Sequence, residues 1–117
     1  MLCSRNPGIM ARTLPRPIAA PDPLALDLAA LGALVRNRRA QNQMRIDDAA
    51  DMLGVSKDVL SRLENGRAVS LDKLFKVLDG LGLNLLVVPK RDVPVARNAL
   101  RDYVQKRVAS PGSQEGA

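Results

Sequence analysis

The segment from residue 45 to residue 66, RIDDAADMLGVSKDVLSRLENG, constrains the fold more than any other part of the chain. Small or apolar residues recur at helical spacing in its first half, at Ile46, Ala49, Ala50 and Leu53. This spacing predicts a short helix with one buried face. Gly54 follows, where glycine permits a left-handed exit from the helix at no steric cost. The chain is therefore expected to turn sharply at Gly54.

A second short helix is predicted directly after this turn. Ser56 stands where a side-chain oxygen can accept a free N–H of the first turn, and Asn65-Gly66 closes the helix. The inward residues are Val59, Leu60 and Leu63, and the outward polar residues are Lys57, Asp58, Ser61 and Arg62. Two helices that cross steeply over a short turn, the second with a polar outer face, have a geometry that fits a DNA major groove.

Two longer helices are predicted on either side of this pair. The first runs from about Asp27, its cap, to Gln41; Asp22-Pro23 is an alternative start because proline suits the first helical turn. Its expected inward residues are Leu28, Leu31, Leu34 and Val35. The other begins at Ser70, is ended by Gly80 with Gly82, and has an expected apolar stripe of Leu71, Leu74, Phe75 and Leu78.

The residues between Gly82 and Pro89 form a short, branched, apolar run that predicts a β-strand. A lone strand beside a helical bundle has unpaired backbone groups, which are costly if buried and adhesive if exposed. Pairing with the same strand of a second chain about a two-fold axis removes both problems. We therefore predict a homodimer with dimerisation contacts at Leu83, Leu85, Leu86, Val87 and Val88.

The segment from Leu31 to Val88 resembles the Cro/repressor-type (XRE) helix-turn-helix family, and SLDKLFKVLDGLGLNLLVV within it is similar to HipB-type antitoxins. The resemblance implies an all-α, lambda-repressor-like bundle of four to five helices with a short C-terminal strand that pairs across a homodimer. HipB-type proteins neutralise a HipA-type serine/threonine kinase toxin and repress their own operon. The C-terminal segment after Val88 is then a candidate for part of the toxin contact.

Specificity for DNA comes from side chains that reach base edges, and affinity comes mainly from phosphate contacts. Lys57 and Arg62 carry donors suited to guanine, and Asp58 carries an acceptor suited to cytosine. The resemblance assigns base contacts to these three positions, with Ser61 a weaker candidate. The predicted phosphate contacts are Arg45, Ser56, Asn65 and Arg67. The alternative is an ordinary solvated helix face, in which Asp58 and Arg62 form an internal salt bridge.

Some positions depart from the pattern of the family. Arg45 and Ile46 stand where the family usually has a Ser or Thr cap followed by glutamine, and Asn42 is expected to take the left-handed conformation of a missing glycine. The resemblance also implies a structural role for Arg39, which buttresses the fold, and for Glu64, which pairs with such an arginine.

The charge is distributed unevenly along the chain. The net charge is +6, but residues 24–88 hold nine Lys/Arg against eight Asp/Glu. The excess lies in the tails, so the placement of charges within the domain must carry a DNA-binding argument. We divide the chain into a disordered arm (1–23), a helix-turn-helix domain (24–88, with the dimerisation strand at 83–88) and a basic C-terminal helix with a disordered tail (89–117).

Composition restricts the remaining function classes. Cys3 is the single cysteine and histidine is absent, which rules out an intrachain disulfide and a Cys/His zinc site and favours a reducing, cytoplasmic location. We expect no enzymatic activity, cofactor, metal or membrane span. The predicted function is a sequence-specific repressor of an inverted-repeat operator in duplex DNA, acting as the antitoxin of a HipA-like kinase. The alternatives are a stand-alone XRE-type regulator and a protein-interaction module with weak DNA binding.

Overall fold

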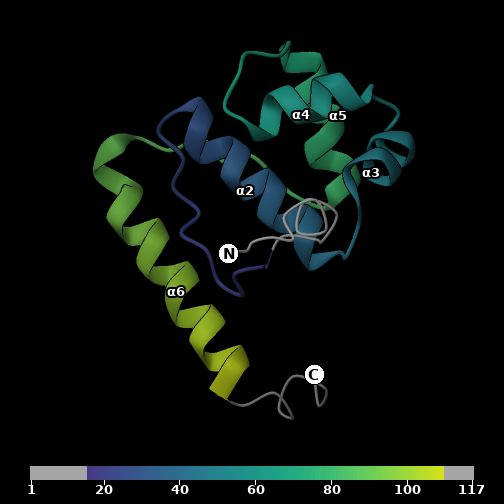
Figure 1. Ribbon diagram of the computed structural model, residues 1–117. Coiled ribbons are helices and arrows are strands. Elements are labelled where there is room, and N and C mark those ends of the chain that lie inside the picture. The colour runs from purple at the N-terminus through teal and green to yellow at the C-terminus, as the bar shows by residue number, and fades with distance from the viewer. Residues whose placement is uncertain (1–15, 110–117) are drawn as a thin grey trace, which may run out of the picture. The chain divides into compact units, whose positions relative to one another are not determined.

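The computed structural model describes residues 16–109, which contain five α-helices and one short 3₁₀ helix (Figure 1). The elements are α2 (Leu28–Gln41), α3 (Ile46–Leu53), α4 (Lys57–Glu64), α5 (Leu71–Leu81), η1 (Lys90–Asp92) and α6 (Val93–Ala109). The predicted disorder at residues 1–15 and 110–117 lies outside the described residues. No helix within 16–109 is long and apolar enough to cross a membrane. The helical class predicted from the sequence is confirmed for this part of the chain.

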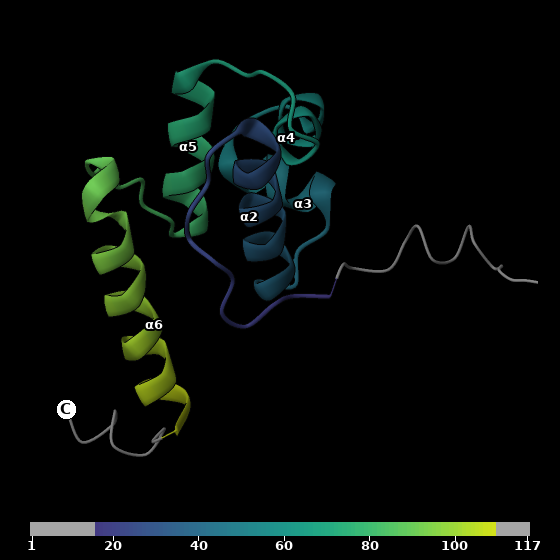
Figure 2. The same ribbon diagram turned by 90° about the vertical axis from the view of Figure 1, so that its left-hand side faces the viewer.

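The first of two compact units comprises residues 16–19 and 25–84 and contains α2 to α5. In this unit α2 packs against α4 and α5, and α3 packs against the same two helices (Figures 1 and 2). Aliphatic and alanine side chains fill the space between them: Val35, Ala49, Ala50, Leu53, Leu60, Leu63, Leu74, Val77, Leu78 and Leu81. The helix-turn-helix pair, α3 and α4, thus packs on both longer helices: α4 contacts α2, and both members of the pair contact α5.

The helix ends follow from local sequence. The Asp27 carboxylate accepts the Ala30 N–H at 2.8 Å, so α2 begins at the predicted cap and the alternative start at Asp22-Pro23 is wrong. Gly54 has φ 74° and accomplishes the predicted left-handed turn between α3 and α4. Gly66 has φ 76° after α4, and Ser70 caps α5 through the Lys73 N–H.

The predicted inward faces are partly wrong. Leu71 and Phe75 are 68% and 51% exposed, and Leu28 is 45% exposed. On α5 the buried face is formed instead by Leu74, Leu78 and two residues that the prediction omitted, Val77 and Leu81. Two overlapping apolar stripes run along this helix, and only packing against α2, α3 and α4 selects the one that is buried.

The structure forms no strand in residues 16–109, and residues 83–89 are neither helix nor strand. A strand requires a neighbouring backbone to pair with, and no segment within residues 16–109 pairs with this one. Leu83 also lies in a different environment from the rest of the run. Its N–H donates to the Leu78 carbonyl at 2.8 Å and its half-buried side chain packs on the core of its own chain, while its role in dimerisation stays a prediction.

The second compact unit comprises residues 20–24 and 85–109. It contains η1 and α6, and α6 is the C-terminal helix that we predicted within residues 89–117. Within this unit the carboxylate of Asp22 pairs with the guanidinium of Arg97 on α6.

A glycine sets the spacing between α2 and α4. A Cβ atom at Gly32 would lie 2.2 Å from the Leu63 carbonyl oxygen and 3.0 Å from that of Glu64, both backbone atoms of α4. Because backbone cannot rotate away as a side chain can, the two helices approach closely only with glycine at this position.

Gly32→Ala should therefore lower the free energy of unfolding of the domain by about 1–3 kcal/mol or more, the usual cost of overpacking. The better helix propensity of alanine is too small to offset this loss. Urea unfolding of the two proteins measures the difference. Arg36→Ala, on an exposed position of the same helix, is the control and should change the free energy of unfolding by less than about 0.5 kcal/mol. An unchanged midpoint for Gly32→Ala would contradict the close approach.

Candidate nucleic-acid interface

The polar face of α4 is the candidate reading surface. Ser56 caps the helix by accepting the Val59 N–H at 3.1 Å, and Leu60 and Leu63 are buried beneath it. With the inner face fixed, Lys57, Asp58 and Arg62 are exposed and Ser61 is half-buried. The first two lie in the first helical turn and Arg62 lies about one turn later. This exposure is what base contact requires, and the contacts themselves stay predictions.

Arg62 is held by a contact that the sequence did not indicate. Its Nε and Nη2 atoms donate to the Ala68 carbonyl oxygen at 3.4 and 3.2 Å. Within the described residues it forms no ion pair with Asp58, so the internal salt bridge of the alternative interpretation is absent. Arginine has five N–H donors, and those on Nη1 remain available to a base or phosphate. A backbone acceptor such as Ala68 has no signature in the sequence, which explains why it was missed.

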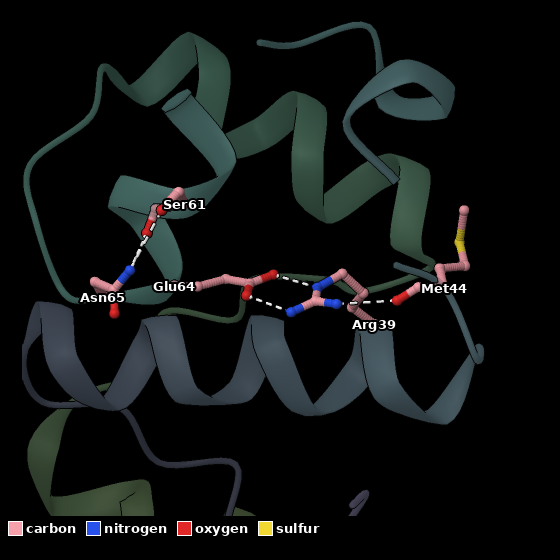
Figure 3. Close-up of polar contacts among 5 residues, drawn as sticks. All are labelled: Arg39, Met44, Ser61, Glu64 and Asn65. Atoms are coloured by element: carbon pink, nitrogen blue, oxygen red, sulfur yellow. Dashed lines mark hydrogen bonds and ion pairs between the residues drawn. The ribbon is translucent and has the colours of Figure 1, made fainter. Parts of the chain in front are cut away.

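The predicted phosphate residues fall into two groups. Arg45 and Arg67 are exposed cations at the two ends of the helix pair. The Asn65 side-chain amide, in contrast, donates to the Ser61 carbonyl oxygen at 2.8 Å and reaches its hydroxyl at 3.4 Å (Figure 3). Asn65 and Ser61 thus already engage each other at the end of α4. Ser56 uses its oxygen as the cap acceptor, and its hydroxyl hydrogen can still be donated.

The start of α3 lacks a side-chain cap, as the sequence predicts. Arg45 occupies the cap position and makes no capping hydrogen bond, while Asp47 and Asp48 lie in the first turn. The free N–H groups there attract an anion, but the two carboxylates repel one. In the turn before α3 the left-handed conformation predicted for Asn42 is wrong. Asn42 has φ −85°, and the left-handed residue is Gln43, with φ 57°.

A buried ion pair fixes α4 against α2 (Figure 3). The Arg39 guanidinium donates from Nε and Nη2 to the two Glu64 carboxylate oxygens at 2.7 and 2.8 Å. A third donor, Nη1, reaches the Met44 carbonyl at 2.9 Å. The side chains of Arg39 and Glu64 are only 8% and 5% exposed. The structural pairing predicted for these residues is confirmed, and the orientation of the reading surface depends on it.

Comparison with known proteins agrees with this geometry. A helix-turn-helix family model matches residues 35–88, which include α3, α4 and α5. The chain is also similar to the ImmF control region 10 kDa protein of Bacillus phage phi105. The two are 36% identical over 64 residues, which cover 52% of this chain and 71% of the phage protein.

Removing one partner of the buried pair should be far more harmful than removing both. Glu64→Leu leaves a buried arginine without its counter-ion and should cost about 3–5 kcal/mol, whereas Arg39→Met combined with Glu64→Leu should recover most of that loss. A double-mutant cycle measured by urea unfolding tests this. If the single and double substitutions destabilise equally, the pair does not act as a coupled unit.

Proposed function

The chain belongs to the helix-turn-helix family and is a DNA-binding transcriptional regulator, and we propose that it acts as a homodimeric repressor and as the antitoxin of a HipBA-like operon. In this proposal two copies of α4 enter successive major grooves of an inverted-repeat operator. Half-sites spaced by about one helical turn, or a multiple of it, then match the two-fold axis of the dimer. The observation that carries the proposal is the polar face of α4, positioned by a buried ion pair and exposed at Lys57, Asp58 and Arg62.

The dimer is supported by the apolar run after the helix-turn-helix unit. Leu85, Leu86 and Val87 are 49%, 71% and 85% exposed, which is unusual for three consecutive aliphatic side chains. Their segment forms no ladder of backbone hydrogen bonds with any other part of residues 16–109. Antiparallel pairing of this segment with its copy would satisfy the backbone groups and cover the side chains together.

The antitoxin role rests on the similarity of residues 70–88 to HipB-type proteins. The protein would then bind and neutralise a HipA-type kinase and repress the operon that encodes both. A reading frame for a HipA-like kinase beside this gene would support the role, and its absence would favour a stand-alone XRE-type regulator. The near balance of charges in residues 24–88 and the carboxylates Asp47 and Asp48 favour a third candidate, an interaction module with weak DNA binding.

Arg62→Ala should reduce affinity for the operator by about 1–3 kcal/mol and relax preference at one base pair, because it removes a positioned donor from the groove. Fluorescence polarisation on the operator, on variants at each position and on unrelated DNA measures both effects over a series of salt concentrations. The matched control is Arg36→Ala, which removes an exposed cation from α2. An equal loss on all sequences would assign Arg62 to phosphate, and no salt-dependent binding by the unmodified chain would favour the interaction module.

Deleting Leu85 to Val88, or replacing Val87 with proline, should convert the dimer to monomers. Proline removes a ladder N–H and cannot sit within a paired strand. Light scattering after gel filtration measures the mass in solution. Met52→Ser, which removes another exposed apolar side chain, is the control and should leave the dimer intact. A dimer that survives both changes in the run would refute pairing through this segment.

A further inference from the structure

Helix α6 has an apolar stripe that is bordered by cations. Leu100 and Tyr103 are 45% and 58% exposed, and Ala96 and Val104 beside them are half-buried. The cations next to this stripe are Arg97, Arg101 and Arg107, and the Arg107 guanidinium lies 5.5 Å from the centre of the Tyr103 ring. At about 100° per residue, Asp102 falls on the opposite side of the helix. We call Leu100, Tyr103, Arg97 and Arg101 the α6 surface.

A carboxylate from the same compact unit already binds this surface. Asp22 Oδ2 accepts a hydrogen bond from Arg97 Nη2, and residues 20–24 belong to the same unit as α6. The hydrogen bond from the Leu24 N–H lowers the pKa of Asp22, and the charges of Arg97 and Arg101 lower it further. The segment APDPL therefore shows the kind of ligand that the surface accepts: an acid on a backbone that is neither helix nor strand, whose Pro21 and Leu24 are half-buried. The residue before each proline in such a segment favours extended backbone angles.

The contact with Asp22 uses only one of the N–H donors of Arg97 that could bind a carboxylate. Its Nε–H is buried and has no hydrogen-bond partner among the described residues. A carboxylate that bound both Nε and Nη2 would form the stronger two-pronged contact. Asp22 does not do so, because its second oxygen, Oδ1, accepts the Leu24 N–H at 3.0 Å. A carboxylate without that internal bond would fit Arg97 better.

The chemistry of the surface selects the class of occupant. A second copy of α6 would bring the same cations and be repelled. Duplex DNA offers phosphates for Arg97 and Arg101 but no apolar surface for Leu100 and Tyr103. An acidic segment of a protein satisfies both halves, since carboxylates meet the arginines and apolar residues cover the stripe.

We propose that the α6 surface docks an acidic, extended segment of a partner protein, and that residues 20–24 occupy it in cis until that partner displaces them. The proposal does not depend on DNA binding by α4. It rests on charge complementarity and on the Nε–H of Arg97, which has no hydrogen-bond partner among the described residues. The partner is identified here by its chemistry, as a protein with carboxylates beside apolar residues on an extended backbone.

The test uses the ¹⁵N-labelled full chain and a synthetic peptide with the sequence of residues 20–26, APDPLAL, added in trans. In an Asp22→Asn chain, whose own acid is removed, the peptide should shift the amide resonances of residues 97–104. A peptide with Asn in place of Asp should bind about tenfold more weakly, as should the Asp peptide on the unmodified chain, where Asp22 competes. The Arg97→Glu/Arg101→Glu chain should show no shifts.

Lys106→Glu is the matched control, because it reverses a charge on the side of α6 away from Arg97 and Arg101 and should leave peptide binding unchanged. Unshifted resonances of α2 to α5 in each variant verify that the helix-turn-helix unit is folded. Equal binding of the Asp and Asn peptides, or no shift in the Asp22→Asn chain, would overturn the proposal. A short duplex of unrelated sequence that shifts the same α6 amides would also overturn it, in favour of a phosphate-binding surface. Operator affinity of the Arg97→Glu/Arg101→Glu chain should be unchanged, which separates this test from that of the repressor.

Discussion

The ion pair between Arg39 and Glu64 joins three parts of the helix-turn-helix unit in one buried contact. Burying two charges costs several kcal/mol for each ion, and the pair is tolerated only because its hydrogen bonds are nearly complete. Two guanidinium N–H groups meet both carboxylate oxygens, and a third meets the Met44 carbonyl in the turn that leads into α3. Helix α2, the turn and the end of α4 are therefore fixed by a single set of donors that has little freedom to reorganise.

The fixed position of α4 against α2 determines which side chains α4 can present to DNA. With Leu60 and Leu63 buried and Gly32 letting α2 approach the α4 backbone, the helix has no room to rotate about its axis. Its polar face is consequently directed outward by packing. At Arg62 a further restraint acts, because the Ala68 carbonyl holds one edge of the guanidinium. A side chain that is already ordered loses less conformational entropy when it binds.

The sequence predicted the parts of this structure that depend on local chemistry. The caps at Asp27, Ser56 and Ser70 and the turn at Gly54 follow from hydrogen-bonding capacity and backbone freedom within a few residues. Features that depend on packing between distant segments were not predictable in the same way. Phe75 fits the helical period yet is exposed, and Leu83 looks like part of a strand yet packs on its own core. The contact between Arg62 and Ala68 involves a carbonyl, which every residue has.

The balance of charges around α4 bears on the proposed dimer. Cations at Arg45, Lys57, Arg62 and Arg67 are offset by Asp47, Asp48 and Asp58 around the same helix pair. Because these charges nearly cancel, binding to DNA releases few counterions, and we expect one copy alone to have a small non-specific affinity for DNA. Linking two such copies makes the second contact intramolecular and raises the overall affinity without any new contact. In the proposed repressor, a domain with this charge balance would therefore need a partner copy for tight operator binding, and a substitution that prevents pairing of the exposed run should also weaken repression.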